Sequence, residues 1–233
     1  MKDAFTRAGS GTVGVLSPFL TVEEAFLLGT WVKSLGGRLA LGPVPTVGDD
    51  DRYPKDVRGG PPAAGTEKFT IRAEKAPNRR GVEAVLAHFE GTVTGFADLT
   101  GSTACLFAGG YPDPNALDPF LSRHTPPAML AVIDLFAHAL AKKADFLLPA
   151  ASVFETDGTL VNHAGLAQTF TRAVRPPVEV RGALQLAADL LGRKGLVQAA
   201  GVRKEIAAAI PQFAGLPTEA AAKAGKRLEL ATV

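Results

Sequence analysis

Cysteine is almost absent from this chain of 233 residues, because Cys105 is the only one. A single thiol cannot close a disulfide within the chain, and it cannot supply the several cysteines of a structural zinc site or an iron–sulfur cluster. Any such centre would have to be held by another domain or chain. Cys105 lies in an apolar run, so we expect a small buried thiol rather than a nucleophile.

Neither sign of charge predominates, since 25 Lys and Arg residues face 23 Asp and Glu residues and leave a net charge of +2. The basic residues form no cluster, so electrostatic binding to nucleic acid is not expected. Long apolar runs are also missing, both at the N-terminus, where a signal peptide would lie, and elsewhere, where about 18 apolar residues would be needed to cross a membrane. We therefore expect a soluble, cytoplasmic protein with no nucleic-acid partner and no direct membrane insertion.

The apolar residues that are present begin with a strand, a helix and a second strand. Residues 12–16 form a short β-branched run, and Thr21 can cap the helix that follows, with Glu24 completing a capping box. Residues 38–41 form a second short apolar run after two glycines. This order predicts a βαβ unit at the start of the chain.

Strands and helices continue to alternate along the rest of the chain. The alternation predicts an α/β fold with a Rossmann-like, mostly parallel sheet flanked by helices, and with a C-terminal helical segment. The expected strands are 69–71, 103–107, 129–133 and 146–148, and the expected helices are 81–89, 135–142, 181–191 and 202–210.

Glycine and proline interrupt this pattern between residues 42 and 75, where neither a helical nor a strand period persists. We expect this stretch to be a long Gly/Pro-rich excursion or linker within one α/β domain, residues 1–216. The two portions that it separates, 1–45 and 76–215, should pack together. Residues 217–233 are rich in alanine and predict a flexible tail.

Two patterns have ordinary explanations. Residues 9–14 match Gly-x-Gly-x-x-Gly, but a nucleotide-binding loop needs a strand before it and a helix after it, and here the predicted strand runs through its end. We therefore interpret it as a flexible lead-in. The four histidines, His88, His124, His138 and His163, are too scattered to predict a metal site.

The segment with the most chemical information is 144–168. A short apolar strand stops at Pro149, and a long polar loop leaves what would be the carboxyl edge of the sheet, where open α/β sheets bind ligands. Gly158 and Gly165 would allow a backbone to approach closely. Thr159, Asn162 and Gln168 offer uncharged donors and acceptors for a polar heterocycle or for the backbone of a neighbouring domain.

This segment resembles the signature of the molybdopterin oxidoreductase superfamily, in which Ala-Asp-x-x-Leu-Pro is followed by Glu, Gly-Thr, Asn, Gly and Gln. The order of segments 13–18, 76–81, 106–110 and the signature is similar to the large α/β part of that superfamily, from about residue 12 to residue 215. Gly165-Leu166 replaces the Gly-Arg that is common in catalytic members. In this respect the chain is more similar to the branch formed by the large peripheral subunits, often called G subunits, of bacterial NADH:quinone oxidoreductase (respiratory complex I).

The resemblance implies a set of cofactor-binding residues and of partners. Molybdopterin guanine dinucleotide is the implied cofactor, whereas iron–sulfur clusters would belong to missing domains or partner chains. The implied partners are other subunits or domains of an NADH:quinone oxidoreductase, which would place the chain at the periphery of the inner membrane. The implied cofactor-binding residues are Glu155, Gly158, Thr159, Asn162, Gly165 and Gln168, with no catalytic residue and no metal ligand.

Members of the superfamily are far longer than this chain, which looks like the C-terminal α/β part of such a subunit. We therefore expect an exposed apolar face where the missing domains would lie. The first hypothesis for function is a non-catalytic domain that supports electron transfer from NADH to quinone without a redox centre of its own. The alternatives are part of a molybdopterin-dependent oxidoreductase, similar to formate dehydrogenase and completed by another chain, and a stand-alone nucleotide- or pterin-binding module.

The loop after Pro149 has two corresponding interpretations. If it is a structural clamp, Glu155, Thr159, Asn162 and Gln168 should form hydrogen bonds within this chain. If it is a pterin-binding edge, several of their polar atoms should point, unpaired, into an open crevice.

Overall fold

The computed structural model describes residues 1–95, 101–118, 127–216 and 225–229. The chain forms two compact units. The main unit consists of Met1–Pro43 and Pro77–Val233, and the second unit, which we call the arm, is Val44–Ala76.

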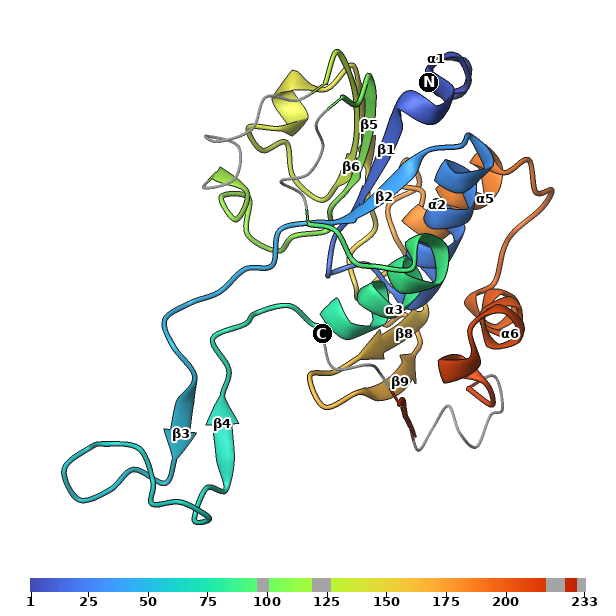
Figure 1. Cartoon of the computed structure of the whole chain (residues 1–233). Coiled ribbons are helices and arrows are strands. Elements are labelled where there is room, and N and C mark those ends of the chain that lie inside the picture. Colours follow the sequence, from blue (N-terminus) through green and yellow to red (C-terminus); the bar gives the residue numbers. More distant parts are fainter. Residues whose placement is uncertain (96–100, 119–126, 217–224, 230–233) are drawn as a thin grey trace. The chain divides into compact units, whose positions relative to one another are not determined.

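A parallel sheet forms the centre of the main unit (Figure 1). Its strand order is β2-β1-β5-β6-β7, and every neighbouring pair is parallel. β1 and β5 are buried along their whole length, because both faces of the sheet are covered. This sheet confirms the predicted α/β fold, and all of its strands lie where the sequence predicts them. They are β1 (Thr12–Leu16), β2 (Arg38–Leu41), β5 (Ala104–Ala108), β6 (Met129–Asp134) and β7 (Phe146–Pro149).

Helices cover one face of the sheet (Figure 1). They include α2 (Val22–Ser34), which contacts β1 and β2, and α3 (Arg79–Glu90), which contacts β2. α3, α5 (Ala183–Leu190) and α6 (Ala199–Ala209) all pack against α2. α2 begins with the predicted capping box, in which the backbone N–H of Glu24 donates to the Thr21 hydroxyl over 3.2 Å and the backbone N–H of Thr21 donates to the Glu24 carboxylate over 2.9 Å. The central position of α2 makes its buried side chains the link between the sheet and the C-terminal helices.

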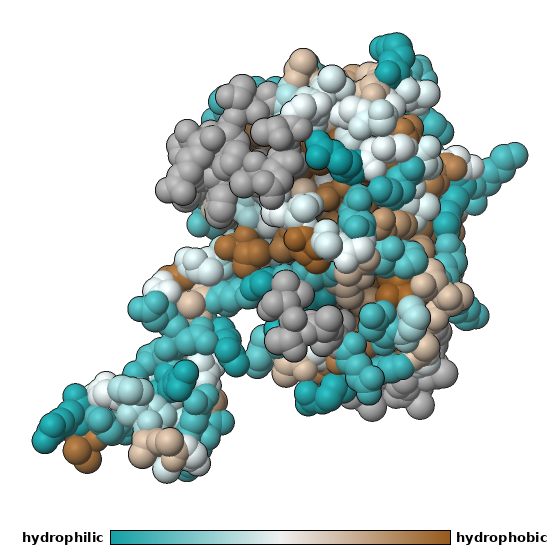
Figure 2. All heavy atoms as spheres, viewed as in Figure 1, coloured by the Kyte–Doolittle hydropathy of each residue, from teal (hydrophilic) through white to brown (hydrophobic). Residues whose placement is uncertain are grey.

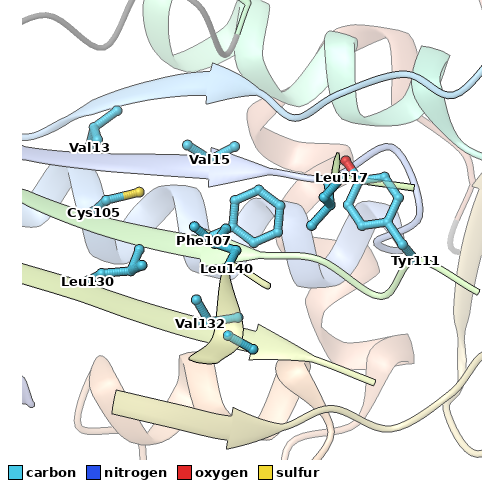
Figure 3. Packing of buried hydrophobic residues seen from close by; sticks show 10 residues of the cluster. Val13, Val15, Cys105, Phe107, Tyr111, Leu117, Leu130, Val132 and Leu140 are labelled. Atoms are coloured by element: carbon cyan, nitrogen blue, oxygen red, sulfur yellow. The ribbon is translucent and has the colours of Figure 1, made fainter. Parts of the chain in front are cut away.

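An apolar cluster covers the other face of the sheet (Figure 3). Phe107 and its neighbours on β1, β5 and β6 point toward Tyr111, Leu117 and Leu140, which come from the connections after β5 and β6. The predicted helix 135–142 is wrong, because only the short 3-10 helix η3 (Ala141–Lys143) forms there.

Side-chain hydrogen bonds explain the missing helix. The backbone N–H of Leu135 donates to the Asp134 carboxylate over 2.7 Å, and that of Ala141 donates to His138 Nδ1 over 3.2 Å. The Ala141 N–H is a main-chain donor that a helix over 135–142 would need.

The segment after Pro149 is more regular than the sequence suggests. It contains an antiparallel hairpin, β8 (Gly158–Val161) and β9 (Leu166–Phe170), and β10 (Lys226–Arg227) pairs with β9. The polar residues of this hairpin give it the composition of a loop, which is why its strands are not predicted. Most of the predicted tail, 217–224 and 230–233, lies outside the described residues.

The arm contains the antiparallel pair β3 (Asp51–Tyr53) and β4 (Phe69–Ile71). β4 confirms the strand expected at 69–71. β3 is not predicted from the sequence, because it begins at the end of the acidic run of residues 49–51. The other short helices among the described residues of the main unit are α1 (Lys2–Ala8), η1 (Gly9–Gly11) and η4 (Pro211–Phe213). Within the described ranges, no helix combines the length and the apolar character that a membrane crossing requires.

Two glycine substitutions test the packing at the end of β5. A Cβ at Gly109 would lie 1.7 Å from Asp134 Oδ2, and the Asp134 carboxylate is held by the backbone N–H groups of Gly110 and Leu135. We expect Gly109→Ala to lower the free energy of unfolding by about 1–3 kcal/mol in urea denaturation. Gly201→Ala is the matched control, because Gly201 lies in α6 with no atom near its Cβ position, and it should raise stability by about 0.5–1 kcal/mol. Equal midpoints for Gly109→Ala and wild type would contradict this packing.

Candidate functional site

The hairpin β8–β9, which carries most of the predicted site, packs against the helical layer through α2 and α3. Gly158 lies so close to Thr21 that a Cβ at this position would be 2.3 Å from Thr21 Cγ2. The start of β8 can therefore reach the first turn of α2 only with glycine at 158. From the sequence we expect Gly158 to allow a close approach of the backbone. In the structure the group that approaches the Gly158 backbone is the Thr21 side chain of the same chain.

Glu23 holds β8 in this position. Its carboxylate accepts hydrogen bonds from the Thr159 backbone N–H over 2.8 Å and from the Thr159 hydroxyl over 2.7 Å. The Arg203 guanidinium donates to the same carboxylate over 3.0 Å, and the Glu23 side chain is fully buried. This buried ion pair joins α2, β8 and α6, and its satisfied oxygens offset the cost of removing a carboxylate from water.

Burial raises the pKa of Glu23, although the contacts with Thr159 and Arg203 act in the opposite direction. Burial also raises the pKa of the adjacent Glu24, against the hydrogen bonds of its capping box with Thr21. Sequence reasoning missed the structural role of Glu23. A signal for it exists, because Glu23 lies three and four residues before Phe26 and Leu27, on the side of α2 that is buried.

Asn78 is the second residue that secures β8. It occupies the N-cap position of α3, but its side chain makes no capping hydrogen bond. Its Nδ2 instead donates to the Leu20 carbonyl over 2.6 Å, and its Oδ1 accepts from the Val161 backbone N–H over 2.7 Å. These two hydrogen bonds connect the segment before α2 to β8, and the Asn78 side chain that makes them is completely buried.

Asn162 and Gly165 form the turn of the hairpin. The Asn162 side-chain oxygen accepts hydrogen bonds from the backbone N–H groups of Ala164 and Leu166 over 2.9 and 3.0 Å. The Gly165 N–H donates to the Asn162 carbonyl over 2.9 Å, and Gly165 has φ of +76°, which favours glycine. Both signature residues therefore have a local structural role.

The remaining predicted site residues lie apart from these. Glu155 accepts hydrogen bonds over 2.8 Å from both the backbone N–H and the hydroxyl of Ser152, and Gln168 is exposed on β9. The donors of Thr159 and the side-chain oxygen of Asn162 are already used within the chain. The predicted residues therefore do not form one set of free groups that fits a pterin, and their cofactor-binding role stays a prediction.

A groove of about 660 Å³ borders the loop that contains Glu155. Residues 155–157, the segment 172–182, α5 and residues 195–199 contribute to its walls. Of the six predicted site residues, only Glu155 lines it. Its charged lining consists of Glu155, Asp157, Arg172, Arg181 and Asp189, and its apolar lining includes Leu184 and Val197.

Tyr111 and His138, which follow β5 and β6 at the carboxyl edge of the parallel sheet, are both held by groups of this chain. The Tyr111 hydroxyl donates to the Pro43 carbonyl over 2.7 Å, and the Tyr111 ring lies 5.0 Å from the Phe19 ring, measured between centroids. His138 Nε2 lies 3.0 Å from the Asp134 carboxylate. Since His138 Nδ1 accepts the Ala141 N–H, Nε2 is the nitrogen that carries the proton, and neither nitrogen is left for a substrate.

The other sequence motifs have structural explanations. Residues 9–11 form a 3-10 turn ahead of β1, so the Gly-x-Gly-x-x-Gly pattern lacks the strand that a nucleotide loop requires. Cys105 is buried on β5, and burial raises the pKa of its thiol to about 12, as expected for a packing residue. In the part of the chain that the structure describes, no three His, Cys, Asp or Glu side chains are grouped to hold a metal ion, and His124 lies outside that part.

The buried carboxylate of Glu23 predicts a pH dependence of stability. Because its pKa is raised above the ordinary value of 4.5, folding favours the protonated form. Its contribution to the free energy of unfolding is therefore fully present below pH 4.5 and is lost as the pH rises through the raised pKa. In urea denaturation at a series of pH values, wild type should gain stability relative to Glu23→Gln as the pH falls from 7. A relative loss at low pH would show that the ion pair with Arg203 outweighs burial.

Comparisons with known proteins agree with the signature in this part of the chain. Residues 119–193 match the family model of molybdopterin oxidoreductase. A stretch of 47 residues, 20% of this chain, is 57% identical to the G subunit of NADH-quinone oxidoreductase from Shewanella oneidensis, and it spans only 5% of that protein. The predicted resemblance is thus confirmed: residues 119–193 match the molybdopterin oxidoreductase family model, and a stretch of the chain is similar to the G subunit of NADH-quinone oxidoreductase.

Proposed function

We propose that the chain is a non-catalytic α/β domain of an NADH:quinone oxidoreductase subunit, which supports electron transfer from NADH to quinone by holding neighbouring domains in place. The observation that carries this proposal is the internal use of the signature. Thr159 bonds to Glu23, and Asn162 bonds to the backbone of its own turn. Groups that a cofactor-binding member would turn toward a ligand here stabilise the hairpin.

Exposed apolar side chains on the main unit support a role in assembly. Val178 is 98% exposed, Leu196 is 91% exposed and Phe154 is 67% exposed. In Figure 2, brown apolar side chains reach the surface between hydrophilic neighbours. If these side chains belong to one contiguous apolar surface, it would be buried against another domain or subunit. The proposed partners are therefore other subunits of the oxidoreductase, which would hold the chain at the periphery of the inner membrane.

The groove beside Glu155 favours a second candidate function. Its volume of about 660 Å³ lies within the range of small-molecule sites, and its lining combines apolar walls with a few charged groups. A nucleotide or pterin that occupied it would contact Glu155 but not the turn at Asn162. The corresponding proposal is a pterin- or nucleotide-binding module, or part of a molybdopterin-dependent oxidoreductase that another chain completes. Molybdopterin guanine dinucleotide would supply the redox chemistry in that case.

Co-purification tests the first proposal directly. The chain should be coexpressed with the other NADH-quinone oxidoreductase subunits of its organism and isolated through a tag on one of those subunits. We expect it to co-purify in a stoichiometric complex, with molybdenum and tungsten far below one equivalent by elemental analysis. Absence of the chain from the purified complex would contradict the structural role. A content of near one equivalent of molybdenum or tungsten would contradict it as well.

A thermal-shift experiment separates the internal clamp from a nucleotide site. Asn162→Ala removes two hydrogen bonds of the hairpin turn and should lower the free energy of unfolding by about 1 kcal/mol. The exposed Gln168 provides the matched control, since Gln168→Ala should leave the midpoint unchanged. Guanosine monophosphate should shift neither variant nor wild type. A nucleotide-dependent stabilisation of wild type that both variants lose would overturn the clamp and support a ligand site at the hairpin, whereas a stabilisation that both variants keep would support binding in the groove beside Glu155.

A further inference from the structure

The groove beside Glu155 has walls that depend on one helix. Its lining comes from residues 155–157, from α5 and its approach, and from residues 195–199, which lead into α6. The first of these segments continues directly into β8, and β8, α5 and α6 all pack against α2. Glu23 and Glu24 in the first turn of α2 are buried, with exposed fractions of 0% and 5%. A change at these two carboxylates can therefore reach the walls of the groove.

Glu23 connects two of the walls. Its carboxylate accepts hydrogen bonds from the backbone N–H and the hydroxyl of Thr159, two residues after Asp157 in the groove lining. It also accepts a hydrogen bond from Arg203 over 3.0 Å. Arg203 lies one helical turn after Ala199, which lines the groove at the start of α6. Glu23 therefore fixes the wall before β8 relative to the wall before α6.

Glu24 lies beside the third wall. Its carboxylate accepts the backbone N–H and the hydroxyl of Thr21 over 2.9 and 3.0 Å. Burial raises the pKa of Glu24, a backbone hydrogen bond from Leu184 lowers it, and the charge of Glu23 raises it. Leu184 lines the groove in the first turn of α5. The two carboxylates therefore act on each other, and together they contact all three elements that carry the walls.

The charges around this pair do not balance. Among the described residues, Arg203 is the cation that pairs with Glu23, and its side chain is 14% exposed. The carboxylates of the helices that pack against α2 have cationic partners of their own, which are Glu83 with Arg79, Glu90 with Lys33, Asp189 with Arg181 and Glu205 with Arg193. In the part of the chain that the structure describes, no ion pair joins Glu23 or Glu24 to the other basic residues of these helices, Arg80, His88 and Lys204. Two buried carboxylates with one cation leave a negative charge uncompensated, which favours the uptake of one proton.

We propose that Glu23 and Glu24 form a proton-operated switch that sets the width of the groove. The contacts in the structure are those of the state without the proton, since Thr159 and Arg203 together give Glu23 three donors. When the pair takes a proton from solvent, Glu23 becomes neutral and Arg203 loses its compensating charge. The guanidinium then turns to solvent, which releases the first turn of α6 and widens the groove at residues 195–199.

A molecule that binds the wide groove is bound together with a proton, because binding and protonation favour the same state. Lowering the pH therefore strengthens such binding. The switch does not depend on whether that molecule is a nucleotide, nor on the assembly role of the chain, so it can fail without either proposed function failing.

Thiol labelling tests the switch at the groove itself. Val197→Cys places a thiol in the wall before α6, and Leu196→Cys at the neighbouring position, which is 91% exposed, corrects for the ionisation of the thiol. The buried Cys105 does not compete for the reagent. As the pH rises above 4.5, the ratio of the maleimide labelling rate at 197 to that at 196 should fall, by up to about tenfold per pH unit for one proton. Glu23→Gln, which is neutral at every pH, should keep the ratio at its low-pH value.

Hydrogen exchange of the wild-type chain gives a measurement that needs no variant. Val202 and Val82 have matched amides, since each donates to the N-cap carbonyl in the first turn of its helix, α6 and α3. As the pH falls and the pair takes up its proton, the protection of the Val202 amide should fall relative to that of the Val82 amide. A constant ratio of the two protection factors would overturn the proposal. A labelling ratio that depends on pH in the same way in wild type and in Glu23→Gln would also overturn it.

Discussion

The buried carboxylate of Glu23 is the contact on which the arrangement of the main unit depends. It accepts hydrogen bonds from both donors of Thr159 and pairs with Arg203, so that α2, β8 and α6 meet at one group. Removing one partner would leave a charge without compensation in the interior, which costs far more than an exposed ion pair contributes. The hairpin and the C-terminal helix are therefore coupled through α2 rather than through direct packing on the sheet.

This coupling gives the signature segment a structural explanation. Gly158 permits the approach to Thr21, Thr159 satisfies Glu23, and Asn162 with Gly165 forms the turn. Each is a residue type that the fold requires at its position. Residues 119–193, which match the molybdopterin oxidoreductase family model, include all of these residues except Thr21 and Glu23.

The two units obtain stability in different ways. The main unit buries β1 and β5 on both faces, between the helical layer and the cluster around Phe107. The arm has an aromatic stack of Tyr53 on Phe69 and several ion pairs, but its Phe69 and Ile71 side chains are 56% and 50% exposed. Exposed ion pairs contribute little to stability, so the arm gains most from covering these two side chains.

The parallel sheet and the capping box could be predicted from the sequence because both depend on local information. A buried parallel strand is a short apolar run, as at residues 12–16, and the capping box is a fixed spacing of Thr21 and Glu24. The positions of the strands in the parallel sheet, the start of α2 and the burial of Cys105 follow from such patterns.

The roles of Glu23 and Asn78 were decided only by the tertiary structure. Glu23 contacts residues 136 and 180 positions away, and Asn78 bonds to a residue 83 positions away, so no local pattern distinguishes them from an exposed glutamate and a helix cap. The helix expected at 135–142 failed for a local reason instead, since His138 contacts Asp134 and accepts the Ala141 N–H that the helix needed. Hydrophobic periodicity reports which face of a segment is buried, whereas the partner of a buried polar group is set by distant residues that folding brings beside it.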